Sequence, residues 1–286
     1  MMFKNPGAEI FIPDNLNMDD ALSRTTHLCI SAHQDDIEIM AYHGILECFG
    51  SPDKWFGGVV VTNGAGSPRD DLYAGYSDDE MRAIRKVEQK KAAYVGEYGF
   101  QALLDYSSSE IKDASDQNAV EDLKEIFRIA RPSIVYTHNP ADKHDTHVAT
   151  VLKVIRAIRE LPVELRPRQV YGCEVWRDLD WMTDDDKILL DVAGHENLAE
   201  ALLGVFDSQI CGGKRYDLAT LGRRRAHATY QASHGTDATS QLSFAMDLTP
   251  LIANPDADII EYTIGCISRF AGEVSARLKR LTLPNP

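Results

Sequence analysis

Cysteine is scarce in this sequence, and no two cysteines lie close together. Five cysteines are spread over 286 residues without a CxxC spacing, at positions Cys29, Cys48, Cys173, Cys211 and Cys266. An odd number of widely separated cysteines argues against a disulfide framework. We therefore expect free thiols in a reducing compartment, with the cytoplasm as the predicted location.

Long apolar runs and an excess of basic residues are also missing. No apolar run approaches the roughly 18–20 residues that a membrane-spanning helix needs, and residues 1–15 lack the basic start and the apolar stretch of a signal peptide. Thirty lysines and arginines are opposed by 44 acidic residues, which gives a formal net charge of −14. Nucleic acids and anionic membranes bind basic surfaces that displace their counterions, so we expect neither as a partner.

The chain alternates short apolar runs with helical patterns. Runs rich in valine and isoleucine, typical of strands buried on both faces, are His27–Ser31, Gly58–Thr62, Ala102–Leu104, Ile134–Thr137 and Val170–Trp176. Apolar residues at helical spacing predict helices over 79–96, 118–130, 148–160 and 260–281. This alternation predicts an α/β fold with a mostly parallel sheet.

The C-terminal part of the sequence is less regular. From about residue 178 the alternation loosens, but no Gly/Ser-rich linker marks a boundary. We therefore predict one domain over 1–286, with a motif-bearing core of about 26–210 and a mixed elaboration of about 211–286. The apolar residues of 260–281 predict a helix that covers the core.

Two groups of polar residues follow predicted strands, at the sheet edge where open α/β proteins bind ligands. His33, Asp35 and Asp36 follow the first strand, and His144 and His147 follow the fourth. His33, Asp36 and His147 would form a His2Asp set, and a catalytic zinc site has three such ligands with room left for water or substrate. The spare carboxylate of Asp35 would serve as a general base. His144 would stabilise an oxyanion or protonate a leaving amine.

Each group alone also has a simpler interpretation. Asp35 or Asp36 would cap a helix over 37–49, and a loop histidine such as His138 is usually solvated. The His2Asp set suits iron or cobalt as well as zinc. The sequence does not establish that the two strand ends are neighbours, so the prediction of a metal site depends on both groups occurring at strand ends.

Together the two groups resemble the motifs of the LmbE/PIG-L family of zinc-dependent N-deacetylases. His33-Gln34-Asp35-Asp36 is similar to the family's Ala-His-Pro-Asp-Asp motif, and residues 144–147 are similar to its His-Pro-Asp-His motif; the resemblance covers roughly residues 26–210. It implies a Rossmann-like three-layer sandwich and a homo-oligomer. It also implies one zinc ion per chain and assigns the site residues: His33, Asp36 and His147 as ligands, Asp35 as general base, and His144 as the group that stabilises the tetrahedral intermediate.

The sequence departs from the family pattern in both motifs. Gln34 replaces a proline, and Asp145-Thr146 stands where the family has Pro-Asp. That family aspartate orients and charges the imidazole that corresponds to His144, and Thr146 carries no charge. Asp145 or Asp142 would have to take over its role.

A further loop follows the second strand. Its glycines at 64 and 66 permit a close approach of the backbone, and Arg69 would pair with a phosphate or a sugar hydroxyl. We predict Asn63 and Arg69 as substrate-binding residues; the alternative is a flexible turn. The glycines do not match the dinucleotide fingerprint, because no helix follows them directly.

These observations predict a hydrolase that removes an N-acyl group, with acetyl expected, from an amino sugar or a related small-molecule conjugate. The alternative is a Rossmann-like module that holds a metal or a ligand without turnover, and the missing aspartate at Thr146 favours it. Hydrolysis of an ester or a phosphoester by the same centre is a third interpretation.

Overall fold

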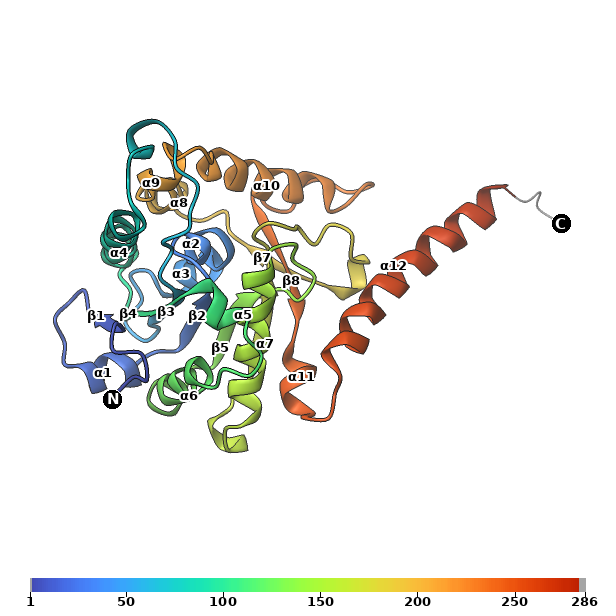
Figure 1. The fold of residues 1–286 in the computed structure, drawn as a ribbon. Coiled ribbons are helices and arrows are strands. Elements are labelled where there is room, and N and C mark those ends of the chain that lie inside the picture. Colours follow the sequence, from blue (N-terminus) through green and yellow to red (C-terminus); the bar gives the residue numbers. More distant parts are fainter. Residues whose placement is uncertain (1, 283–286) are drawn as a thin grey trace.

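One eight-stranded sheet forms the centre of the molecule (Figure 1). The computed structural model describes residues 2–282. Its strands are β1 (Glu9–Phe11), β2 (His27–Ser31), β3 (Phe56–Thr62), β4 (Phe100–Tyr106), β5 (Ile134–His138), β6 (Gln169–Cys173), β7 (Lys187–Asp191) and β8 (Leu242–Asp247). They lie in the order β1-β4-β3-β2-β5-β6-β8-β7. All five predicted strands are present.

The sheet changes its winding direction at β2. From β2 the chain moves through β3 and β4 on one side, and it then returns to place β5 and β6 on the other side. These five strands are parallel, whereas β1, β8 and β7 pair antiparallel with their neighbours. Ligands of open α/β sheets bind at the carboxyl ends of the strands that flank such a switch point, here β2 and β5.

Helices cover both faces of the sheet, which confirms the three-layer α/β class (Figure 1). One face packs against α2 (Asp36–Met40), α3 (Tyr42–Cys48), α4 (Asp78–Val95) and α8 (Glu196–Gly204). The other face packs against α1 (Met18–Ser23), α5 (Ser108–Lys112), α6 (Asn118–Ala130), α7 (Asp145–Arg159) and α11 (Thr249–Ala253). Along β3, Val59 and Val61 point into one core and Val60 into the other, as the alternation of a doubly covered strand requires.

The remaining helices lie in the C-terminal half. They are α9 (Asp207–Ile210), α10 (Tyr216–Tyr230) and α12 (Ile259–Thr282). The expectation that the last helix covers the core is wrong: only its first turns contact the body, and Ile267 onward is exposed. In Figure 1, α12 projects from the rest of the chain. Among the described residues, no helix is both long and apolar enough to cross a membrane.

Candidate metal centre and catalytic site

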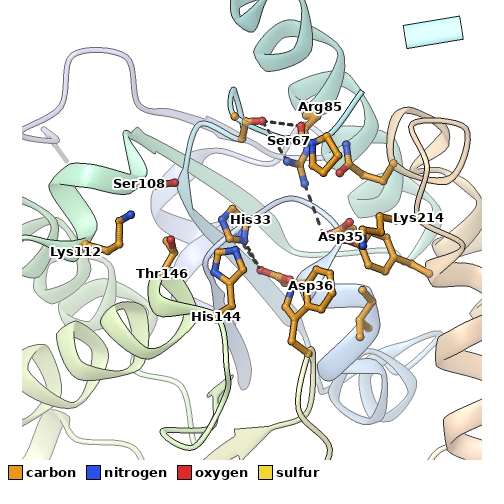
Figure 2. A pocket seen from close by; sticks show the side chains of 17 residues that line it. His33, Asp35, Asp36, Ser67, Arg85, Ser108, Lys112, His144, Thr146 and Lys214 are labelled. Carbon is orange, nitrogen blue, oxygen red and sulfur yellow. Dashed lines mark hydrogen bonds and ion pairs between the residues drawn. The ribbon is translucent and has the colours of Figure 1, made fainter. Parts of the chain in front are cut away.

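The two predicted polar groups meet because β2 and β5 are neighbours in the sheet. His33 lies in the loop after β2, and Asp36 is the first residue of α2. His147 lies in the first turn of α7, which begins at Asp145, three residues before its predicted start. Figure 2 shows His33, Asp36 and His144 converging on one side of a pocket.

The three predicted ligand atoms form a nearly equilateral triangle. Nδ1 of His33 lies 3.2 Å from Nε2 of His147, and Oδ2 of Asp36 lies 3.3 Å from the first atom and 3.4 Å from the second. An ion with tetrahedral bonds of about 2.0–2.1 Å has ligand atoms about 3.3–3.4 Å apart. The donor set and its spacing therefore fit a small divalent metal ion without rearrangement.

His138 also lies beside Asp36, but the lone pair of its Nε2 atom already accepts a hydrogen bond. Its Nε2 atom accepts a hydrogen bond of 2.8 Å from the backbone N–H of Ala32, and its ring stacks on His147 with 3.9 Å between centroids. The expectation of a solvated loop histidine is wrong, because His138 is the last residue of β5 and is fully buried. It supports the ligand set by packing against the ring of His147.

Charge and hydrogen bonding prepare the ligands for a cation. Burial opposes the ionisation of Asp36, but the imidazoles of His147, His138 and His33 outweigh it and hold the pKa of Asp36 well below its usual range. Nδ1 of His147 lies 3.3 Å from Oδ2 of Asp142. This contact places the proton on Nδ1 and leaves Nε2 free to bind a metal.

Asp35 is held in a strained backbone conformation at the cavity wall. Its φ of 88° lies in the left-handed region. For a residue other than glycine, this backbone conformation costs about 1–3 kcal/mol of conformational free energy. Its carboxylate makes no capping bond to α2, so the capping interpretation is wrong for Asp35. Burial raises the pKa of Asp35 well above its usual range, although the nearby guanidinium of Arg85 opposes the shift.

Arg85 connects the loops that surround Asp35. Its Nη2 donates to the carbonyl of Gln34 at 2.6 Å and its Nη1 to the carbonyl of Gly64 at 3.2 Å. Nη2 also lies 3.8 Å from Oδ1 of Asp35, and Figure 2 shows this pair. The sequence did not single out Arg85. The signal that it offered was the helical spacing of three polar residues, Arg85, Glu88 and Gln89, with Met81 and Ala92, on what proves to be the inward face of α4.

His144 lacks the charged partner that the family pattern would give it. Its ring lies 5.0 Å from that of His33 and stacks on that of His147 at 4.5 Å. Within residues 2–282 its buried Nδ1 has no hydrogen-bond partner. Asp142 contacts His147 instead, and Asp145 is exposed. Burial, with a further contribution from His147, lowers the pKa of His144.

A cavity of about 520 Å³ is lined by His33, Asp35, Asp36, Arg85 and His144 (Figure 2). The wall beyond the ligand triangle includes Ser67, Ser108, Lys112, Trp176, Lys214 and Tyr216. The loop after β3 contributes through its glycines, Ser67 and Pro68, but the structure does not bring Asn63 or Arg69 into the wall. Asn63 accepts from the N–H of Ala65, and Arg69 pairs with Asp78 and with the carbonyl of Ala65.

Known proteins share both the sequence pattern and the fold. Residues 28–158 match the family described as GlcNAc-PI de-N-acetylase, PIG-L. None of the curated proteins matches the sequence. The N,N′-diacetylchitobiose deacetylase from Pyrococcus horikoshii superimposes with a TM-score of 0.60 at 18% identity, over 80% of this chain and 86% of that one.

Two further solved structures show that this fold occurs with different chemistries. The 4-carboxy-2-hydroxymuconate hydratase GalB from Pseudomonas putida KT2440 has a TM-score of 0.60 at 16% identity, over 78% of this chain and 96% of that one. The A40926 pseudoaglycone deacetylase Dbv21 has a TM-score of 0.55 at 18% identity, over 78% of this chain and 97% of that one. At these identities the likeness establishes the fold, and the activity has to be argued from the site.

Proposed function

Because this chain belongs to the LmbE/PIG-L family, we propose that it is a metal-dependent hydrolase that removes an N-acyl group, acetyl in the first instance, from an amino sugar or a related small-molecule conjugate. The observation that carries the proposal is the ligand triangle, in which the ligand atoms are 3.2–3.4 Å apart. The triangle lies beside a buried spare carboxylate and an open cavity. A structural zinc site is normally closed by four ligands, whereas this set offers three.

His33, Asp36 and His147 would hold one zinc ion per chain, and iron or cobalt suits the same donors. Such an ion supplies a Lewis acid that polarises the acyl carbonyl and lowers the pKa of water to near 7. Zinc is the ion that we propose, because two imidazoles and one carboxylate form one of its usual catalytic sets.

Asp35 would accept the proton of the attacking water and pass it to the nitrogen as the C–N bond breaks, so that a carboxylic acid and an amine are released. Arg85 keeps a positive charge beside this carboxylate. The ring of His144 lies 5.0 Å from that of the proposed ligand His33. The neutral ring of His144 would donate a hydrogen bond to the oxygen on which negative charge develops.

The test of this proposal combines metal analysis with an activity assay on purified wild type and Asp35→Asn. Metal content is measured by plasma mass spectrometry, and amine release from a panel of N-acetylglucosamine conjugates. We expect about one zinc ion per chain in both proteins and release by the wild type alone. The matched control is Asp145→Asn, which removes an exposed carboxylate near the same site. This variant should keep its activity. Near-normal turnover by Asp35→Asn would falsify the assignment of the base.

Among the described residues, Nδ1 of His144 has no hydrogen-bond partner, and this favours a second candidate, a module that binds a metal or a ligand without turnover. The same assay separates the two, because metal without amine release from any conjugate supports the second candidate. We also propose a cytoplasmic location, in keeping with five free thiols, and a homo-oligomeric state.

A further inference from the structure

The exposed face of α12 carries an apolar heptad pattern. Seven residues alternate spacings of four and three: Ile260, Ile264, Ile267, Ala271, Val274, Leu278 and Leu281. Their side chains are open to solvent, with 69% exposure for Ile260, 58% for Leu278 and 72% for Leu281. A spacing that averages 3.5 residues is the pattern of a helix that packs along another helix as a coiled coil.

The body of the protein does not use this face. The helix docks through a different side, where Thr263 and Cys266 are buried and the hydroxyl of Tyr262 donates to the carbonyl of Asp247 at 2.5 Å. From Ile267 to Thr282 every residue is exposed. A free helix of this length is marginal in water, and Gly272 weakens it further. The segment therefore needs a partner to remain helical.

We propose that the partner is α12 of a second copy of this chain, packed antiparallel. The apolar face repeats every 3.5 residues, and a second copy presents a face with the same repeat and the same length. With Ile267 opposite Ala271 of the partner subunit, Ile260 lies opposite Leu278 of the partner subunit, and the pairing is symmetric. Such an isologous contact closes at two subunits.

The distribution of charge selects the antiparallel direction. Helix α12 carries four basic and two acidic residues in a chain whose formal net charge is −14. Its basic end holds Arg277, Lys279 and Arg280, whereas Asp256 and Asp258 precede its start. Parallel pairing would bring the two basic ends together. Antiparallel pairing places each basic end beside the acidic start of the other helix.

A membrane surface is the less favourable occupant. The strongly acidic body would be repelled by anionic lipids, and the narrow seven-residue stripe is suited to a helix rather than to a broad lipid face. Vesicle binding is therefore an outcome that would overturn the proposal.

The first experiment measures molar mass by light scattering and sedimentation for wild type and for Val274→Lys. We expect wild type at twice the chain mass of 31.9 kDa and an association at least about 100-fold weaker for the variant, since the contact would bury two lysines. Val274 is exposed in one copy, so circular dichroism should show an intact fold. Ala276→Lys places the same charge on another face of α12 and should leave the dimer intact.

Monomeric wild type at about 100 μM would overturn the proposal, as would an assembly that Val274→Lys leaves unchanged or a monomer that binds vesicles of phosphatidylcholine and phosphatidylserine. The second experiment tests direction by disulfide cross-linking, with the unmodified chain as control for its native thiols. The double variant Ile260→Cys, Leu278→Cys should cross-link between subunits, whereas Leu278→Cys alone should not. Efficient cross-linking of Leu278→Cys alone would establish parallel pairing and overturn the antiparallel arrangement.

Discussion

At the scale of single residues, the site depends on which carboxylate each imidazole contacts. Asp142 is placed so that one oxygen contacts Nδ1 of His147 and the other accepts from the backbone N–H of His144. It therefore orients a proposed metal ligand. The ring of His144 has no equivalent partner in the described part of the chain.

Removing the carboxylate of Asp142 should weaken metal binding. Partners of this kind fix the ligand tautomer, and their loss typically lowers metal affinity about 10–100-fold. We expect Asp142→Ala to show such a drop in a zinc competition titration against a chelator. Asp145→Ala, which removes an exposed carboxylate three residues away, serves as the control. Equal affinities in the two variants would contradict the role given to Asp142.

Restoring an acid at position 146 should raise activity. Thr146 is buried beside His144 and lines the cavity, so Thr146→Asp would place a negative charge near the unpaired ring. A charged imidazole stabilises a developing oxyanion better than a neutral one, and we expect kcat to rise about 10-fold. Thr146→Asn has the same size without the charge. If both variants change kcat alike, the effect is steric and does not come from the charge at position 146.

At the scale of elements, the loop after β3 is shaped by a glycine that closely approaches its neighbours. Gly64 has a φ of +68°, and a Cβ atom there would lie 2.3 Å from Oε1 of Gln34. We expect Gly64→Ala to lower the free energy of unfolding by about 1–2 kcal/mol, since both strain and crowding oppose it. Urea denaturation measures the loss. The control is Gly66→Ala in the same loop, where nothing lies within 4 Å; equal losses would contradict the explanation.

The elements that the sequence predicts well are those whose apolar pattern is set by packing in the core. Strand β2 has its predicted bounds, and α6 matches its predicted 118–130, because their apolar periodicity is determined by the core alone. Strand β7 has a mixed burial pattern and gives no such signal. The sequence predicts His33, Asp36 and His147 at one edge of the sheet, but it does not predict their contact, which depends on the strand order. The sequence did not single out Arg85, and it gave His138 as a solvated loop residue, because burial of a polar group depends on its tertiary partners.

At the scale of the whole molecule, stability should fall in mild acid. Burial, with a smaller contribution from Lys54, lowers the pKa of His27 from 6.5 to about 4. The imidazole of His27 therefore binds a proton less readily in the folded state than in the unfolded chain. The contribution of His27 is complete above pH 6.5 and is lost as the pH falls towards 4.

We expect wild type to lose about 3 kcal/mol of unfolding free energy over this range on account of His27. The measurement is urea unfolding at pH 7.5, 6, 5 and 4. His27→Gln cannot take up the proton and should show a shallower dependence. Parallel curves for the two proteins would show that His27 is not responsible.

The candidate metal ligands come from both sides of the switch point in the sheet. His33 follows β2 and His147 follows β5, 114 residues further along the chain. An ion bound to both would act as a cross-link across this loop, and a covalent link closing a loop of about 100 residues is worth about 4–5 kcal/mol in the chain-entropy description. Metal supply would then govern the lifetime of the folded chain as well as its chemistry, and a metal-starved cell would hold less of the protein.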